Sequence, residues 1–138
     1  MTIMNENTNS TPVASGSDPA HIVDRLLDAL ASRDVNAVDA CYAPDVVIWH
    51  NANNQAEDRE QNLQGLAAIL PQWSDLSYDE IWRVDIPGGV AQRHRLRGRG
   101  PDGAEFEVRI ALFVTLDSDG RILRVDEYLD PSQLPPMG

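Results

Sequence analysis

Two titratable side chains occupy strand positions where an apolar residue is expected, and both could move a proton. His50 follows the apolar run Val46–Trp49 in YAPDVVIWHN, so it stands at the end of a predicted strand. Glu127 shares a strand face with Val125 and Leu129 in RVDEYLD. An unperturbed imidazole has a pKa of about 6.5. A buried carboxylate needs a partner to stay ionised. The pair indicates acid/base chemistry, with His50 as the general base.

Each of these side chains also has a purely structural interpretation. His50 could simply hydrogen-bond a loop carbonyl at the end of its strand, and Glu127 could form a buried ion pair that only fixes packing. If Arg93 or His50 is the partner of Glu127, the carboxylate stays ionised and can orient the imidazole, as the third group of a catalytic triad does. The sequence leaves both interpretations open.

Arginines alternate with other residues in QRHRLRGRG, so in a strand they fall on one face. We expect Arg93 to face a cavity and, with Arg95, to favour a substrate carboxylate or enolate. The opposite register turns Gln92, His94 and Leu96 inward and leaves the arginines in water. One β-bulge would be enough to produce it. In that register His94 becomes the reserve acid/base.

Metal and phosphate sites are not predicted. The three histidines, at residues 21, 50 and 94, lack the spacing of metal ligands. The glycine-containing segments PGGV and GRGPDG have the composition of hairpin turns and not of a phosphate-binding loop. We therefore expect chemistry without a metal or cofactor.

The elements that must position these side chains follow from periodicity and turn residues. Helices are predicted over DPAHIVDRLLDALASRD, VNAVDACY and REQNLQGLAAIL, with Asp18 and Asp34 as N-caps of the first two. DVVIWHN is the first strand, and NANNQAED is a polar loop. SYDEIWRVDI, VAQRHRLR, EFEVRIALFVTL and RILRVDEYL are strands joined by turns, which predicts a four-stranded antiparallel meander. Helices followed by such a sheet indicate an α+β fold with a pocket under the curved sheet.

Composition narrows the class of partner. The 138 residues carry a formal net charge of −11, which argues against nucleic acid and anionic membrane as partners. Residues 1–17 are expected to be a disordered lead without the features of a signal peptide, and residues 132–138 a C-terminal tail. One cysteine excludes an intrachain disulfide. Without an export signal, the expected location is the cytoplasm.

The order of these segments resembles the NTF2-like superfamily, which has a cystatin-like cone fold. The matching pieces are ALASRDVNAVDACYAPDVVIWHN, the turn DGRI and the closing strand RVDEYLDP. The superfamily includes ketosteroid isomerases, limonene-epoxide hydrolases and SnoaL-type polyketide cyclases. The resemblance implies three N-terminal helices packed on a curved mixed or antiparallel sheet, within a SnoaL-type domain at residues 18–131.

The resemblance also implies roles for individual residues. His50 lies eight residues beyond Tyr42, the spacing at which the isomerases hold their general base. The isomerase oxyanion donors correspond to Leu26 and Leu112, which cannot donate a hydrogen bond. A ketosteroid isomerase of the usual mechanism is therefore not expected.

The epoxide hydrolases use an Asp-Arg-Asp set to activate water. In this alignment Arg93 matches the arginine, Arg95 replaces the first aspartate and Glu127 matches the second. The water-activating set is therefore incomplete. SnoaL-type cyclases require only a histidine or aspartate acid/base, so their pattern is the easiest to reconcile with His50 and Glu127.

The expected function is acid/base catalysis without cofactor, by isomerisation, aldol cyclisation or water addition next to a carbonyl. The substrate would be a small hydrophobic molecule. The alternative is a non-catalytic ligand-binding or dimeric scaffold protein. A homodimer is expected because Trp49, Phe113 and Tyr128 would crowd the outer face of the sheet. Besides Arg95, the predicted substrate-binding residues are Leu26, Ile48, Leu66, Leu70, Val108, Ile110, Leu112, Val125 and Leu129.

Overall fold

The computed structural model describes residues 21–136 as three α-helices and one curved sheet. In chain order the elements are α1 (Ile22–Ala31), α2 (Val35–Cys41), β1 (Tyr42–His50), β2 (Gln55–Glu57), α3 (Arg59–Ile69), the short 3₁₀ helix η1 (Leu70–Gln72), β3 (Ser74–Ile86), β4 (Gly89–Arg99), β5 (Glu105–Leu116), β6 (Ile122–Leu129) and the 3₁₀ helix η2 (Pro131–Gln133). The predicted lead at 1–17 and the predicted cap Asp18 lie outside the described residues.

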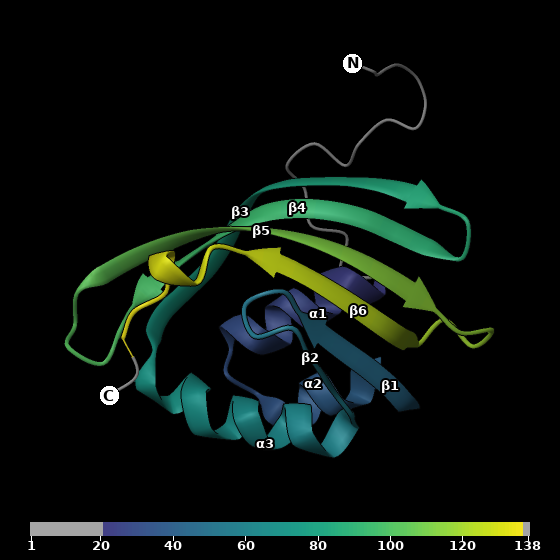
Figure 1. The fold of residues 1–138 in the computed structure, drawn as a ribbon, viewed down its shortest axis with the longest axis horizontal. Coiled ribbons are helices and arrows are strands. Elements are labelled where there is room, and N and C mark those ends of the chain that lie inside the picture. Colours follow the sequence, from purple (N-terminus) through teal and green to yellow (C-terminus); the bar gives the residue numbers. More distant parts are fainter. Residues whose placement is uncertain (1–20, 137–138) are drawn as a thin grey trace.

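The sheet is mixed, and its strand order is β2-β1-β6-β5-β4-β3. Strands β3 to β6 form the predicted antiparallel meander, while β1 joins the far side of β6 in parallel. Figure 1 shows the sheet arching over α1 and α2, with α3 along the open side of the arch. The predicted α+β class and curved mixed sheet are confirmed. Because β1 pairs with β6, residues near position 50 come beside residues near position 127.

Helix starts are fixed by side chains that accept backbone hydrogen bonds. Asp34 caps α2 as predicted, accepting from the Ala37 N–H at 3.1 Å. Asp58 and Gln61 form a capping box at the start of α3. The ring of His21 accepts from the Val23 N–H at 3.1 Å and caps α1.

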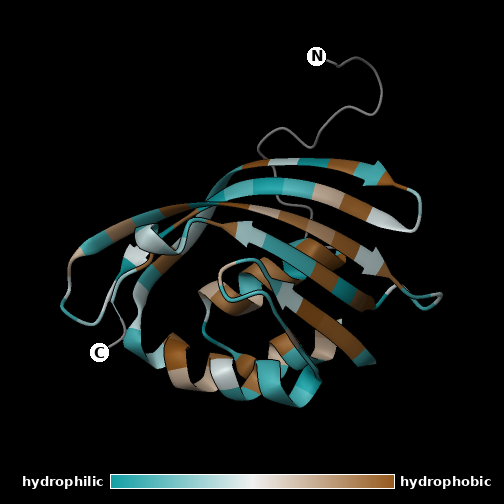
Figure 2. Ribbon diagram, viewed as in Figure 1, coloured by the Kyte–Doolittle hydropathy of each residue, from teal (hydrophilic) through white to brown (hydrophobic). Residues whose placement is uncertain are grey.

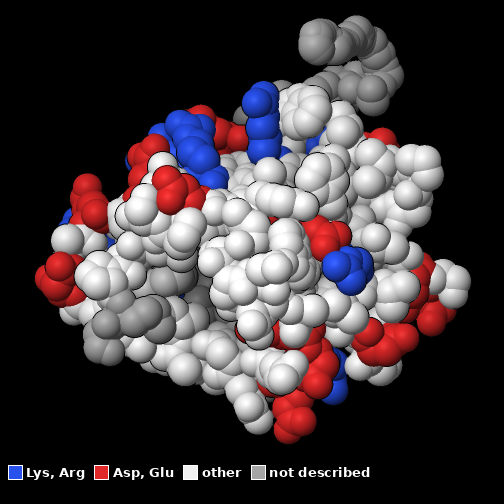
Figure 3. All heavy atoms as spheres, in the orientation of Figure 1, with Lys and Arg blue, Asp and Glu red and all other residues white. Residues whose placement is uncertain are grey.

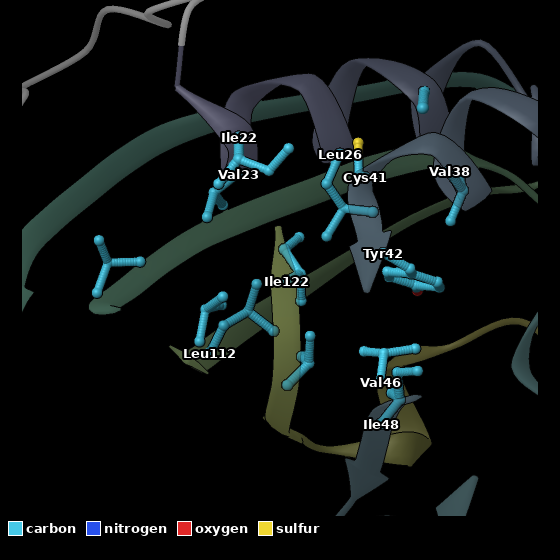
Figure 4. Close-up of a cluster of buried hydrophobic side chains, with 14 of the residues drawn as sticks. Ile22, Val23, Leu26, Val38, Cys41, Tyr42, Val46, Ile48, Leu112 and Ile122 are labelled. Atoms are coloured by element: carbon cyan, nitrogen blue, oxygen red, sulfur yellow. The ribbon is translucent and has the colours of Figure 1, made fainter. Parts of the chain in front are cut away.

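The core lies between the concave face of the sheet and the helices. Apolar residues of α1 and α2 pack against alternate residues of β1, β5 and β6, and Figure 4 shows part of this cluster. In Figure 2 apolar residues, in brown, recur along the helices and strands that surround this core. Val23, Val38, Val108 and Ile122 have no exposed surface. Burial of these side chains holds the curvature of the sheet around the helices.

The register of β4 corrects the prediction that Arg93 faces the cavity. Gln92 and His94 are buried, whereas Arg93 is exposed on the convex face and its guanidinium lies 5.1 Å from the centre of the Trp82 ring. His94 pairs with the buried Ile110 of β5, so its strand neighbours must point the other way. The inverted register considered from the sequence is therefore the observed one.

Arg95 is likewise on the convex face and not in the cavity. Its guanidinium makes two hydrogen bonds to Asp79, at 2.7 and 2.8 Å, and lies 3.0 Å from Glu80. Figure 3 shows arginine side chains beside acidic ones on the outer side of the sheet. Outside the core these charges find partners and water at small desolvation cost, which explains the orientation of the whole alternating run.

The segment predicted as a polar loop contains the short strand β2. Gln55–Glu57 pairs antiparallel with the end of β1, with His50 opposite Gln55 and Ile48 opposite Glu57. The strand is short and polar, so it carries no alternating apolar pattern. Its consequence is that Glu57 is brought next to the strand that carries His50.

Candidate active site

His50 and Glu127 are directly opposite each other on the parallel strands β1 and β6. Their side chains meet, with 2.8 Å between His50 Nδ1 and Glu127 Oε1. Asn51 closes the strand pair beside them: its backbone N–H donates to the Glu127 carbonyl, and its side chain bonds both backbone groups of Leu129. The apolar strand thus ends on His50 because its partner strand presents a carboxylate there.

A second carboxylate lies at the other nitrogen of the same ring. His50 Nε2 is 3.3 Å from Glu57 Oε1. That oxygen also accepts a hydrogen bond from Asn62 Nδ2 at 3.0 Å, and the Asn62 carbonyl accepts one from the Tyr42 hydroxyl at 2.7 Å. The imidazole is therefore held on both sides, and the set joins β1, β2, α3 and β6. Neither Glu57 nor Asn62 was identified from the sequence.

The surroundings of His50 favour its protonated form. The hydrogen bond to Glu127 raises the pKa of the ring above its ordinary value, and the charges of Glu127 and Glu57 act in the same direction, while partial burial opposes them. The side chains of His50, Glu127 and Glu57 are each about a quarter exposed, at 25%, 24% and 29%. These contacts therefore shift the ring of His50 towards its imidazolium form.

A separate chain of buried polar groups reaches the cavity from α1. Arg83 of β3 pairs with Asp24 through both carboxylate oxygens, and both side chains are almost fully buried. Arg83 Nε also donates to Gln92 Oε1 at 2.9 Å, and Gln92 Nε2 lies 3.1 Å from His94 Nδ1. Desolvation, with the nearby Arg83 charge, lowers the pKa of His94 to about 4. His94 is therefore a neutral imidazole at pH 7.

The two histidines line one small cavity under the sheet, with a volume of about 80 Å³. Of the predicted substrate-binding residues, six line it: Leu26, Ile48, Leu66, Ile110, Leu112 and Val125. His50 and Glu127 form its polar wall, and Tyr42, Asn62, Tyr78 and His94 add polar groups that were not predicted there, except His94 in the alternative register. The roles assigned to these residues stay predictions.

Four other predicted site residues lie elsewhere, apart from Arg93. Leu70 and Val108 are buried in the core, Leu129 is partly buried against it, and Arg95 is on the convex face. Two wider, open depressions, of about 490 and 620 Å³, include neither His50 nor Glu127. The first is lined largely by charged residues, and the second by charged and apolar residues together with His94. Of these three spaces, the small cavity is the one that combines His50 and Glu127 with an apolar lining.

The outward orientation of Arg93 could have been predicted from the sequence by asking which set of alternate residues on its strand is apolar. Val90 and Leu96 are on the same strand as Arg93 but alternate with it, so they share a face with Gln92 and His94. Both are buried. The resemblance to the epoxide hydrolases favoured Arg93, whereas the apolar residues of the strand favoured the observed register. Asp24 and Arg83 gave no comparable signal, because each lies in an ordinary amphipathic segment.

Two absences hold for the described part of the chain. Within residues 21–136, no cluster of three or more His, Cys, Asp or Glu residues is placed to hold a metal ion. None of the helices formed by these residues is long and apolar enough to cross a bilayer.

Family comparison agrees with this architecture. The family model described as SnoaL-like domain matches residues 23–125. The chain belongs to the SnoaL-like domain family. A comparison with curated protein sequences finds no match. The family match covers most of the chain, includes His50 and ends at Val125, so Glu127 lies just beyond it.

Solved structures with the same fold are distant in sequence. A ketosteroid isomerase-like protein from Catenulispora acidiphila DSM 44928, in complex with trimethylamine, has a TM-score of 0.72 at 18% identity over 85% of this chain and 90% of that one. A provisionally assigned polyketide cyclase from Pseudomonas putida KT2440 has a TM-score of 0.71 at 15% identity over 86% and 96%. An LEH-like epoxide hydrolase from M. tuberculosis has a TM-score of 0.67 at 18% identity over 81% and 82%. At such identity these structures show the fold alone. The family match and this shared fold together place the chain in the NTF2-like superfamily.

The outer face of the sheet carries the aromatic residues on which the predicted homodimer depends. Phe113 and Tyr128 are 46% and 43% exposed, and Trp49 packs edge-on against Tyr128 at 5.2 Å between ring centres. Phe113 also contacts Tyr128, with 6.0 Å between ring centres. The homodimer stays a prediction.

Proposed function

We propose that this SnoaL-like protein is a cofactor-free acid/base catalyst that transfers a proton next to the carbonyl of a small molecule. The observation that carries the proposal is the 2.8 Å contact between His50 Nδ1 and Glu127 Oε1 at the wall of an otherwise largely apolar cavity. A titratable pair in such a place is a site at which charge develops away from bulk water. Isomerisation and aldol cyclisation both begin with this step.

Within the pair, the contacts support Glu127 as the group that accepts the proton. Each nitrogen of His50 has a carboxylate oxygen in hydrogen-bonding range, so the ring satisfies both only when both nitrogens carry hydrogen. The raised pKa of His50 supports the same form. An imidazolium has no lone pair to accept a proton, so His50 acts as the cation that orients and balances Glu127. This assignment reverses the roles expected from the sequence.

The cavity volume limits the substrate. Ligand pockets usually enclose about 300–1,000 Å³, and a water molecule occupies about 30 Å³ in the liquid. The observed 80 Å³ therefore accepts a compact molecule or one reactive group of a larger one. The C. acidiphila protein, described in complex with trimethylamine, supports a small ligand. The ring-sized substrate expected from the sequence would require Leu30 or Leu66, both partly buried at the cavity wall, to move.

The same small volume favours a second candidate, a non-catalytic binding or scaffold protein. A core that is nearly filled is stable without a ligand, and the outer aromatic residues would then carry the function through assembly. The two candidates differ in one measurable property, because only the catalyst exchanges a carbon-bound hydrogen.

Deuterium exchange into acetone tests the proposal without knowledge of the natural substrate. Acetone in D₂O is followed by proton NMR with wild-type protein, Glu127→Gln and His50→Gln. Because general acid/base groups contribute about 10²–10⁴-fold, we expect both variants to lower the catalysed rate by about that factor. Glu105→Gln, a matched change at an exposed residue of β5, should keep the wild-type rate.

Circular dichroism and thermal melting show whether each variant is folded. In Glu127→Gln the folded state should persist, because the glutamine side chain keeps the shape of the native glutamate. Exchange at the buffer rate with folded wild-type protein, or an unchanged rate in Glu127→Gln, would overturn catalysis by this pair. The binding or scaffold function would then be the better account.

A further inference from the structure

His94 is the second histidine of the cavity, and the proposed proton transfer does not use it. It lies in the middle of β4, is 4% exposed and forms part of the cavity wall with Tyr78. The Tyr78 ring packs against it at 84°, with 5.1 Å between ring centres, which restricts rotation of the imidazole. Because the ring is buried and held in one orientation, the hydrogen-bond partners of its two nitrogens determine what it can do in the cavity.

The partners of His94 determine which nitrogen carries the hydrogen. Arg83 has only donors, so the Gln92 atom that meets Arg83 Nε must be the carbonyl oxygen. The amide NH₂ of Gln92 therefore faces His94, and Nδ1 accepts its hydrogen bond at 3.1 Å. A neutral ring that accepts at Nδ1 carries its hydrogen on Nε2. The low pKa of His94, about 4, keeps the ring neutral at pH 7.

The anchor of this arrangement is the buried ion pair of Asp24 and Arg83. Both oxygens of Asp24 engage the guanidinium, which leaves Nε directed at Gln92. A bidentate contact of this kind fixes the plane of the guanidinium as well as its position. The orientation of Gln92, and through it the tautomer of His94, is therefore set from α1.

The Nε2–H group is left without a protein acceptor. Within residues 21–136, no hydrogen bond joins His94 Nε2 to a protein acceptor. Among these residues the only fully buried unpaired side-chain nitrogen or oxygen is Trp73 Nε1, so His94 Nε2 keeps some accessible surface although the ring as a whole is buried. Its neighbours in the cavity wall include the apolar Ile110 and Leu112. A polar N–H beside apolar groups is costly unless a ligand or water accepts from it.

We propose that His94 is a catalytic residue whose Nε2–H donates to the carbonyl oxygen of the substrate and stabilises the enolate. As Glu127 takes the proton from the adjacent carbon, the electron pair of the C–H bond forms a carbon–carbon double bond, and the π electron pair of the carbonyl moves onto its oxygen as negative charge. The proton then returns from Glu127 to the substrate. Asp24, Arg83 and Gln92 are positioning residues.

This donor supplies what the sequence comparison found missing, because Leu26 and Leu112 stand where the isomerases hold their oxyanion donors. A neutral N–H can stabilise the enolate without giving up its proton. The inference rests on the proposed function for the reaction, but the tautomer and the hydrogen bond to a carbonyl can be measured separately.

Nitrogen-15 NMR of the histidine rings tests the tautomer directly. At pH 7 we expect His94 to give the shifts of a neutral ring with hydrogen on Nε2. In Gln92→Leu the fixed donor to Nδ1 is lost, and the signals should move towards the average of the two tautomers. Hydrogen on Nδ1 of His94 in the wild-type protein would overturn the inference.

The carbonyl shift of carbon-13-labelled acetone tests the hydrogen bond. We expect a downfield shift on binding to wild-type protein and to His94→Gln, whose amide keeps a donor, and its loss in His94→Leu. Acetone deuterium exchange should fall about 10²–10³-fold in His94→Leu, as for loss of one oxyanion donor, and recover largely in His94→Gln. A folded His94→Leu variant with the wild-type shift and rate would contradict the inference.

His50→Gln separates the two proposals. If it abolishes exchange but leaves the acetone shift intact, the donor and the proton-transfer pair are distinct groups, as proposed. If wild-type protein shows the tautomer and the shift but no exchange, the proposed function fails and the catalytic role of His94 fails with it, while His94 remains a donor to a bound carbonyl.

Discussion

The two histidines of the cavity are the same residue type in opposite electrostatic settings. His50 stands at a strand end, a quarter exposed, between Glu57 and Glu127, and its pKa is raised. His94 lies in mid-strand, buried, beside Gln92 and the Arg83 charge, and its pKa falls to about 4. His94 is therefore neutral at pH 7, whereas His50 is shifted towards its cationic form. The difference assigns them separate roles in one cavity, since environment and not residue type sets the protonation state.

The residues that hold His50 also differ in burial and in position along the chain from those that hold His94. Around His50 the two carboxylate partners are partly exposed, and one of them, Glu57, comes from the three-residue strand β2. Around His94 they form one buried chain from α1 through β3 to β4. We expect substitutions around His50 to cause a small loss of stability and substitutions around His94 to cause a large one.

The largest stability effect should follow from Asp24→Asn. This change leaves the buried Arg83 guanidinium without its counter-charge, which costs about 3–5 kcal/mol in comparable pairs. Glu57→Gln, on the exposed side, should cost about 1 kcal/mol or less. Urea unfolding measures both values. Equal losses in the two variants would contradict the contrast between a rigid and a tolerant side.

An acid-sensitive contribution to stability should come from His94. Its pKa is about 4 in the folded protein and about 6.5 in the unfolded chain, so the unfolded chain takes up the proton first as the pH falls. The contribution is present above pH 6.5 and should be lost, by about 3 kcal/mol, as the pH falls to about 4. Unfolding free energies of wild type and His94→Gln across this range measure it by difference. A constant difference would refute it.

The smallest effect should come from His50 and have the opposite sign. Its pKa is raised on folding, so the stabilisation is complete below about pH 6.5 and is lost as the pH rises through the folded value. Because the ring and its partners are partly exposed, we expect less than about 1 kcal/mol. The same comparison with His50→Gln from pH 6 to 9 checks this. Greater stabilisation at high pH would show that the sign is wrong.

Local patterns in the sequence predicted most of the elements. The strand at residues 105–116 was placed with its observed bounds, and α3 was placed to within one residue. These segments have a clear period and flanking turn or cap residues. The short strand β2 was not predicted, because three polar residues carry no periodic signal and pair only because β1 offers them an edge.

The candidate site was predicted in part. His50 and Glu127 were identified because a polar residue on an apolar strand face is visible in the sequence, and their contact follows from the parallel pairing of β1 with β6. The position of Arg93 was wrong, because alignment to a distant family outweighed the parity of Val90 and Leu96 on the same strand.

The order of helices and strands, the alternation of buried and exposed faces and the two polar residues at strand positions were determined by the sequence alone, because neighbouring residues encode them. The partners of each histidine, the buried chain from Asp24 to His94 and the small size of the cavity were decided only by the tertiary structure. These features depend on contacts between residues tens of positions apart in the sequence. The contacts form because the whole sheet curves over the helices. The direction in which the pKa of each ring is shifted follows from those contacts.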